Sequence, residues 1–378
     1  MSVNARNQYV ARNDIAVVEK PRQLPGPQFG IGLELVQVDA LVKASQARAD
    51  FKVSGAGLTV AVLDTGLNTE HVDFQGRIPE PRNFTTDNGE KPEDATDGNG
   101  HGTNVAGIIV AGADHRGIAP GAKVIPVKVL NNAGGGSFQA VASALQWVLD
   151  HQAQHDISAV CMSLGDSGNY QKDTLFPGDA IQARLRELRG RRVAVCVAAG
   201  NDYFKHGSQQ GMGYPAIFRE TVSVGAVYDE DEGSFSYGSG AIASSTAADR
   251  ITPFSQRLHE SVNFDTHTDI FAPGAPVTSS GISGPHGESV QHGTSQATPV
   301  TTGVILLMQE LYFRTTGELP DVSDVVTWLR KGAAVIHDGD DEDDNVSHTN
   351  LDFRRVDAPG ALRAIRRHLE LEALSRGA

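Results

Sequence analysis

The chain has 378 residues, of which 32 are Lys or Arg and 46 are Asp or Glu, so its formal net charge is −14. At about 100–200 residues per domain, this length predicts two to three domains or one large α/β domain. The acidic balance argues against nucleic acid or an anionic membrane surface as the main partner. No apolar run approaches the ~20 residues of a membrane-spanning helix.

The start of the chain and its cysteines both bear on location. Residues 1–7 contain no apolar segment of the kind found in a secretory signal. Cys161 and Cys196 are too few for a disulfide framework, and both lie in apolar, β-branched runs that favour buried free thiols. Because free thiols persist in a reducing compartment, we expect a cytoplasmic protein.

Residues 1–30 are polar and contain three prolines, which predicts an extended N-terminal arm. After the arm, short runs of continuous hydrophobicity are followed by patterns with helical spacing, as in residues 138–150. Continuous rather than alternating hydrophobicity is typical of strands buried on both faces of a parallel sheet. These runs lie at residues 58–63, 123–130, 157–164, 193–199 and 221–227. We therefore expect an α/β fold with a mostly parallel central sheet and helices on both faces.

Two later segments are less regular. Residues 228–268 are rich in Ser, Asp and Gly and are expected to form a long surface excursion. Residues 337–345 contain six acidic side chains among nine. The ordinary interpretation of such a run is a solvated loop. The alternative is calcium binding, because carboxylate oxygens suit calcium, although the spacing is unspecific.

In a parallel α/β sheet, functional groups lie in loops at the carboxyl ends of the strands, and Asp64, Ser163 and Asn201 fall at such ends. A further candidate is Ser295, in a His-Gly-Thr-Ser segment directly before an apolar helical stretch. Free backbone N–H groups at a helix start favour developing negative charge beside such a serine. Taken alone, however, a serine at this position is more simply a helix cap.

Two other short motifs supply a histidine and a carboxylate. His101 lies between two glycines where another helix is expected to begin, and Asp64 ends a buried strand. Singly, each is more simply a structural or turn residue. Together, Asp64, His101 and Ser295 supply the orienting carboxylate, the general base and the nucleophile of a hydrolase. Imidazole has a pKa near 6.5, so it can take the serine proton and later protonate the leaving group.

The order Asp, His, Ser and the residues around each of them strongly resemble the subtilisin-like (S8) serine proteases. The resemblance runs from about residue 32 to residue 303 and, more faintly, to the C-terminus. It implies that Asp64, His101 and Ser295 are the catalytic triad. It also implies that the Asn201 amide and the Ser295 backbone N–H form the oxyanion hole, which stabilises the tetrahedral intermediate.

The family's substrate cleft also has counterparts in this sequence. The resemblance assigns two strands that pair with an extended peptide, at Gly134, Gly135 and Gly136 and at Ser163, Leu164 and Gly165. It places Phe138 in the pocket for the fourth residue before the cleaved bond (S4). It places Gly213 at the base of the pocket for the residue just before the bond (S1), which implies a preference for large apolar P1 side chains. Without the resemblance, residues 134–136 are simply a flexible glycine turn, and the missing Gly-Lys-Ser/Thr ending argues against a phosphate loop.

Within the family, residues 82–87 and 97–101 resemble the intracellular branch. The arm is too short for the folded inhibitory prodomain of secreted members, whereas intracellular members carry a short N-terminal extension that can lie across the active site. We therefore expect residues 1–30 to be such an extension, the inhibitory arm of a zymogen, with residues 23–27 as a loose counterpart. Residues 31–378 are expected to form one peptidase domain.

Several positions depart from the family pattern. Asn104 stands where most relatives have a second histidine, Gln296 replaces a methionine after the nucleophile, and Val300 replaces another histidine. None of these changes removes a catalytic group. Residues 111–117 leave little room for the family's main calcium loop, although Asp73 matches one of its ligands. We expect no cofactor for catalysis, while a structural calcium ion stays open and metal ligands stay unassigned.

Two other groups of residues have weaker chemical interpretations. His151 and His155 have the i, i+4 spacing of a zinc site on a predicted helix, but Gln152 stands where a metalloprotease has its glutamate. Cys161 and Cys196 lack a matching histidine environment, so buried core thiols remain the expectation.

These observations predict a serine endopeptidase that binds peptide or protein substrates as an extended strand and hydrolyses them through an acyl-enzyme. No nucleic acid or membrane partner is expected, and the oligomeric state is left open. The alternatives are a catalytically weak subtilase-fold protein that binds peptides or scaffolds a partner, and a dedicated protease that matures one precursor. The complete triad with Asn201 disfavours the first alternative, whereas the excursion at 228–268 favours the second by restricting access.

Overall fold

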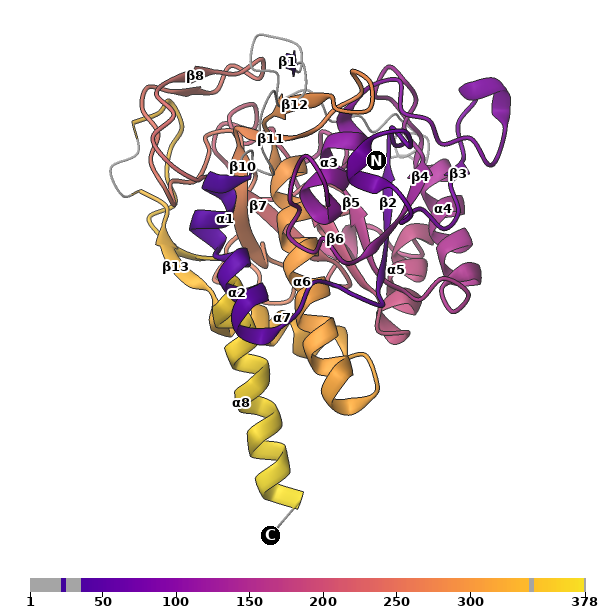
Figure 1. The fold of residues 1–378 in the computed structure, drawn as a ribbon. Helices are drawn as coiled ribbons and strands as arrows, with labels where there is room; N and C mark the ends of the chain where they lie inside the picture. The colour runs from indigo at the N-terminus through magenta and orange to yellow at the C-terminus, as the bar shows by residue number, and fades with distance from the viewer. Residues whose placement is uncertain (1–21, 25–34, 340–342, 377–378) are drawn as a thin grey trace.

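The computed structural model describes residues 22–24, 35–339 and 343–376 (Figure 1). The main sheet in this part of the chain consists of β2 (Thr59–Asp64), β3 (Arg82–Asn83), β4 (Lys123–Lys128), β5 (Ile157–Met162), β6 (Ala194–Ala198), β7 (Val222–Tyr228), β10 (Ile270–Ala275), β13 (Ala334–His337) and β14 (Asp352–Arg355). These strands are hydrogen-bonded in the order β13-β14-β10-β7-β6-β5-β2-β4-β3. Every neighbouring pair is parallel except β13 with β14. The expected mostly parallel sheet is therefore confirmed.

Helices cover both faces of this sheet (Figure 1). They are α1 (Val36–Val42), α2 (Ala44–Phe51), α3 (His101–Val110), α4 (Phe138–His151), α5 (Ala180–Gly190), α6 (Thr294–Thr316), α7 (Val322–Gly332) and α8 (Ala358–Arg376). In β2, Val60 and Val62 face a core shared with α3 and α6, whereas Ala61 and Leu63 face a core shared with α4 and α5. Because successive side chains of a strand point to opposite faces, a strand is apolar throughout when both faces are covered. This arrangement explains the continuous apolar runs that mark the strands in the sequence.

A smaller antiparallel sheet packs against α3. In it, β1 (Arg22–Leu24) pairs with β12 (Glu288–Gln291), which also pairs with β11 (Val277–Ser280). The rest of the expected arm, residues 1–21 and 25–30, lies outside the described residues. The remaining short elements are the hairpin of β8 (Phe235–Ser236) and β9 (Ile242–Ala243) and the 3₁₀ turns η2 (Val72–Phe74), η3 (Asn88–Glu90) and η4 (Asp173–Leu175).

The segment expected as a surface excursion, residues 228–268, is partly core, because residues 251–258 are buried. Arg257 is fully buried with its Nε 3.0 Å from a carboxylate oxygen of Asp338. Burial would raise the pKa of Asp338, but the Arg257 charge and the hydrogen bonds from His348 and Thr349 together outweigh it, and the pKa is lowered to about 2. Asp338 belongs to the acidic run expected as a solvated loop, so that expectation is wrong for this residue. Residues 340–342 of the run lie outside the described residues.

The structure also places the two groups with weaker chemical interpretations. His155 Nε2 lies 2.9 Å from Glu80 Oε2, and its ring stacks with that of His151. Cys161 stands opposite Cys196 in the register of β5 and β6, and both are buried free thiols, as expected. Burial raises the pKa of both thiols, that of Cys196 to about 12. Neither thiol is therefore poised as a nucleophile, because the nucleophilic form is the thiolate.

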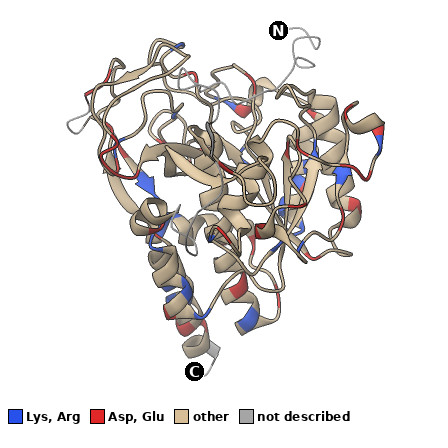
Figure 2. Cartoon of the chain, turned by 45° about the horizontal axis from the view of Figure 1, so that its top comes forward, with Lys and Arg blue, Asp and Glu red and all other residues tan. Residues whose placement is uncertain are grey.

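α8 extends away from the body of the molecule (Figures 1 and 2). Figure 2 shows acidic and basic residues interspersed along α8 and over the rest of the face in view. On that face, charge of both signs is therefore spread out rather than gathered into one basic patch. None of the helices in the described ranges is long and apolar enough to span a membrane.

Candidate active site

An aspartate and a histidine meet where β2 ends and α3 begins. Asp64 is the last residue of β2 and is fully buried, and His101 is the first residue of α3. His101 Nδ1 lies 2.7 Å from Asp64 Oδ1, the same oxygen that accepts a hydrogen bond of 2.7 Å from the Thr65 backbone N–H. A proton on Nδ1 facing this carboxylate leaves the Nε2 lone pair of a neutral imidazole as the proton acceptor.

Asp97, which received no role in the sequence analysis, holds the start of α3. The residue before the helix, Gly100, has a left-handed φ of 101° and no side chain with which to cap it. Asp97 supplies the cap instead: Oδ1 accepts from the Gly100 N–H at 2.9 Å, and Oδ2 accepts from the Thr103 N–H and hydroxyl at 3.0 and 2.7 Å. Its Oδ1 also accepts from the Thr65 hydroxyl at 2.9 Å. The sequence signal was a carboxylate just ahead of a helix start, a common cap position.

Ser295 lies in the first turn of α6 and is buried, with 1% of its surface exposed. Its backbone carbonyl accepts a 2.7 Å hydrogen bond from the Ser163 hydroxyl, and its own hydroxyl donates to the Ser163 carbonyl at 3.3 Å. These two bonds attach the start of α6 to the chain that leaves β5. Backbone N–H groups in the first turn of a helix have no carbonyl partner within the helix, so this position favours an anion.

The starts of α3 and α6 are joined by side-chain amides. Gln291, at the end of β12, donates from Nε2 to the Gly100 carbonyl at 3.1 Å. Gln296 donates from Nε2 to Gln291 Oε1 at 3.2 Å and to Asn104 Oδ1 at 3.4 Å. The residues next to His101 and Ser295, Gly100 and Gln296, are therefore linked through Gln291, and the structure brings these two predicted site residues to the same region.

Asn201 follows β6 and approaches the same helix start. Its Oδ1 accepts hydrogen bonds from the Thr294 N–H at 3.0 Å and from the Thr294 hydroxyl at 2.6 Å. These donors fix which end of the amide faces α6. Its Nδ2 has no hydrogen-bond partner within the described ranges, so its N–H groups are available to a ligand beside Ser295.

The two segments predicted to bind an extended peptide both lie at the carboxyl edge of the sheet. Residues 163–165 follow β5, and residues 134–136 form a hairpin turn between β4 and α4. In this turn Gly136 bridges back to Leu130, and a Cβ on Gly136 would lie 2.5 Å from the Val129 carbonyl oxygen. Glycine is therefore required at this position by close backbone approach.

The predicted pocket residues Gly213 and Phe138 are connected through Tyr214, which follows Gly213 in the chain and packs against Phe138. The Gly213 N–H donates to the Ala199 carbonyl at 2.8 Å, which joins the Gly213 segment to the chain leaving β6. The Phe138 ring meets the Tyr214 ring edge to face, with centroids 4.6 Å apart. Phe138 is buried, so its packing against Tyr214 makes an aromatic wall beside Gly213.

A buried cluster beside β11 presents metal-type ligands. His71, Asp73 and His115 each offer one ligand atom, all within 4.8 Å of one another. The Asp73 carboxylate already accepts from His115 Nδ1 at 2.6 Å, from the Ser280 hydroxyl at 2.7 Å and from the His115 N–H at 3.0 Å. Burial would raise the pKa of Asp73, but these bonds and the His115 charge lower it to about 2. Because calcium prefers oxygen ligands and these oxygens already have protein donors, the cluster fits calcium poorly.

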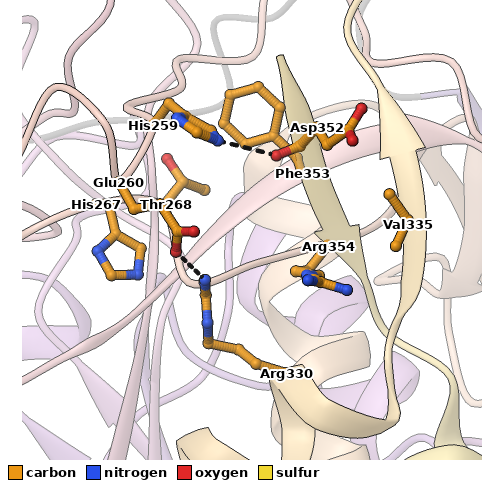
Figure 3. Close-up of a pocket in the computed structure, with 9 residues that line it drawn as sticks. All are labelled: His259, Glu260, His267, Thr268, Arg330, Val335, Asp352, Phe353 and Arg354. Carbon is orange, nitrogen blue, oxygen red and sulfur yellow. Dashed lines mark hydrogen bonds and ion pairs between the residues drawn. The ribbon is translucent and has the colours of Figure 1, made fainter. Parts of the chain in front are cut away.

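A separate pocket, of about 270 Å³, lies beside β14 (Figure 3). Arg330 reaches Glu260 at 2.6 Å across it, and His259 Nε2 lies 3.0 Å from the Asp352 carbonyl oxygen. None of the residues predicted to form the active site lines this pocket. It is therefore distinct from the site at the starts of α3 and α6.

Comparison with known proteins agrees with this geometry. The model of the subtilase family matches residues 55–336. The chain is 28% identical over 283 residues to an intracellular serine protease of Paenibacillus polymyxa, which covers 74% of this chain and 72% of that protein. It is 29% identical over 280 residues to the major intracellular serine protease of Bacillus subtilis (73% and 75%) and 30% identical over 276 residues to subtilisin DY of Bacillus licheniformis (72% and 83%). The expected resemblance to the intracellular branch is thereby confirmed. The chain belongs to the subtilase family of subtilisin-like serine proteases.

Proposed function

We propose that the chain is a serine endopeptidase in which Asp64, His101 and Ser295 act as the catalytic triad. The observation that carries this proposal is the 2.7 Å contact of His101 Nδ1 with the buried Asp64, at a helix start bonded to that of Ser295. Ser295 Oγ attacks the peptide carbonyl carbon while His101 Nε2 takes its proton. The same proton passes to the leaving amine as the C–N bond breaks. Water then gives a proton to His101 and attacks the acyl carbon, the bond from that carbon to Ser295 Oγ breaks, and His101 returns the proton to Oγ.

The oxyanion of each tetrahedral intermediate is proposed to be held by two donors. One is the Ser295 backbone N–H in the first turn of α6, and the other is Asn201 Nδ2. The anchoring of Asn201 Oδ1 by Thr294 supports this role, because it holds the amide in one orientation before substrate binds. Donors that need no reorganisation are the most effective at stabilising developing charge. This chemistry needs no cofactor.

The substrate is proposed to bind as an extended strand between two segments of the chain, residues 134–136 and residues 163–165. Main-chain hydrogen bonds then supply affinity, and pockets for alternate side chains supply specificity. Phe138 is assigned to the S4 pocket and Gly213 to the base of S1. Since Gly213 has no side chain, it leaves room for a large P1 residue, which supports the proposed preference for large side chains. The apolar character of the preferred P1 residue is carried over from the family alone.

Residues 1–30 are proposed to be an inhibitory extension that precedes a peptidase domain of residues 31–378. The pairing of β1 with β12 supports this proposal, because β12 ends just before the segment that carries Ser295. The names of two relatives as intracellular proteases support a cytoplasmic location. Deletion of residues 1–25 is expected to raise peptide hydrolysis, and unchanged activity would overturn the inhibitory role.

A fluorophosphonate, which phosphonylates an activated serine hydroxyl, tests the proposed chemistry. We expect labelling of the full chain or of the form lacking residues 1–25, and loss of labelling in Ser295→Ala. Thr298→Ala, a hydroxyl deletion one turn further along α6, is the matched control and should retain the label. Absence of labelling in both forms would favour a peptide-binding protein without activity. Cleavage of a single sequence in a peptide library would favour a dedicated maturation protease.

A further inference from the structure

A carboxylate borders the predicted S1 pocket. Asp166 follows directly on residues 163–165, which are assigned to one wall of the substrate cleft. Its backbone N–H donates to the Tyr214 carbonyl at 2.9 Å, and its Oδ1 accepts from the Tyr214 N–H at 2.9 Å. These two bonds tie Asp166 to the residue next to Gly213. The cleft wall and the pocket base therefore meet at this carboxyl group.

The carboxyl group faces the space that Gly213 leaves open. A Cβ placed on Gly213 would lie nearest to the Asp166 backbone carbonyl oxygen, at 3.4 Å, and 3.6 Å from Asp166 Oδ1. Both distances are ordinary van der Waals contacts, so a methyl group in this space would touch Asp166. A P1 side chain that reaches the base of S1 therefore ends beside this carboxylate.

Asp166 has no cationic partner among the residues that the structure describes. Its Oδ1 accepts from the Tyr214 and Gly168 N–H groups, and its Oδ2 accepts from the Tyr170 hydroxyl, each at 2.9 Å. A carboxylate offers about four acceptor positions, so one remains on Oδ2. The side chain is partly exposed rather than sealed in the core.

Two other carboxylates of the chain, those of Asp202 and Asp173, differ from Asp166 in this respect. Asp202, which follows Asn201, lies 2.9 Å from the Lys205 ammonium. Asp173, in η4, lies 2.5 Å from the Arg219 guanidinium. Each of these two charges is already neutralised within the chain, whereas that of Asp166 is positioned by neutral donors alone.

We propose that Asp166 is a specificity-determining residue that selects a lysine or arginine side chain at P1. The inference rests on the proposed function, since it requires that residues 163–165 and Gly213 bind the substrate. A long apolar P1 side chain would cover the carboxylate without pairing it, which is costly. An ammonium or guanidinium group instead makes a charge-assisted hydrogen bond with this carboxylate. For this chain, the proposal therefore replaces the apolar P1 preference carried over from the family with a preference for large cationic residues.

The test uses two quenched peptides that differ only at P1, one with lysine and one with norleucine. These side chains share their methylene chain and differ in the terminal ammonium group, and mass spectrometry confirms the bond that is cleaved. Asp166→Asn is the informative variant, because its carbonyl oxygen still accepts both backbone N–H groups and its amide donates to the Tyr170 hydroxyl. Asp150→Asn makes the same change of charge on an exposed residue at the far end of α4.

In the full chain, and in the form lacking residues 1–25, we expect kcat/KM to be higher for lysine than for norleucine. Asp166→Asn should lower that ratio by about tenfold or more, as expected for loss of a charged hydrogen bond. Fluorophosphonate labelling reports whether Asp166→Asn is folded and keeps an activated serine, and Asp150→Asn should match the native ratio. A native preference for norleucine, or an unchanged ratio in Asp166→Asn with labelling intact, would overturn the assignment of Asp166 alone. Absence of labelling and of hydrolysis in both the full chain and the form lacking residues 1–25 would refute the proposed function, and this inference with it.

Discussion

The most informative perturbation of the site's framework is Asp97→Ala. This substitution keeps the triad residues and removes the carboxylate that caps the start of α3. The N–H groups of Gly100 and Thr103 lose their acceptor, and the Thr65 hydroxyl loses the bond that ties the end of β2 to this start. Because His101 is the first residue of α3, loss of the cap acts directly on the position of its imidazole ring.

The magnitude follows from the groups left behind. Gly100 and Thr103 are buried, and a buried donor without a partner costs about 1–3 kcal/mol. For these two N–H groups we expect a fall of roughly 2–6 kcal/mol in the free energy of unfolding. A displacement of the imidazole by about 1 Å should lower kcat about 10²-fold with little change in KM. Asp97→Asn should lie between native and Asp97→Ala, because its amide nitrogen cannot accept from the Thr103 N–H.

Urea unfolding measures the first quantity, and peptide hydrolysis at a temperature where every variant is folded measures the second. Glu93→Gln removes an exposed charge from the same loop and serves as the control. A native free energy of unfolding in Asp97→Ala would refute the capping argument. A destabilised Asp97→Ala that keeps the native kcat would refute the claim that the cap positions His101.

Three further predictions concern a donor, a buried acid and the metal-type cluster. Asn201→Ala should lower kcat by about 10²–10³-fold, a magnitude that is known for this family's own oxyanion donor and is not worked from this structure. An unchanged kcat would contradict the role of Asn201. Burial raises the pKa of Asp229 from 3.8 to about 7, so its contribution to stability is full below pH ~4 and is lost as pH rises through 7. Asp229→Asn should therefore raise the melting temperature at pH 8 more than at pH 4. The corresponding gain in the free energy of unfolding is at most about 4 kcal/mol, and an equal effect at both pH values would contradict the prediction. The pKa of Asp73 is lowered to about 2, so its contribution to stability is present above pH ~4 and is lost as pH falls toward 2. Because the cluster fits calcium poorly, Asp73→Asn should lower the melting temperature equally with and without a chelator.

The sheet was predictable because each buried strand carries its signal within its own few residues. A strand covered on both faces is a continuous apolar run, and the five runs picked out in the sequence correspond to β2, β4, β5, β6 and β7. β10 was not predicted, because its sequence includes Pro273 and Gly274, which are typical of loops. It forms between β7 and β14, where pairing over long sequence separations outweighs these local preferences.

The groups that surround the site were less predictable than the triad. Asp64, His101 and Ser295 each stand in a short motif, whereas the surroundings of Asp166 depend on Tyr214, which is far away in the sequence. The surroundings of Arg257 were equally unpredictable. In the sequence it is indistinguishable from a surface arginine, and only the fold places Asp338 beside it. A charged side chain is informative about function only when its partner, or the absence of one, is known.

The departures from the family pattern near the nucleophile belong together. A buried amide must find both donors and acceptors, since an unpaired polar group in the core costs free energy. Asn104 donates to the Ser289 carbonyl at 2.9 Å and accepts from Gln296, which also donates to Gln291. Either change alone would leave part of this network without its partner. Asn104 and Gln296 are therefore one structural feature, which joins the two helix starts that hold the imidazole and the serine.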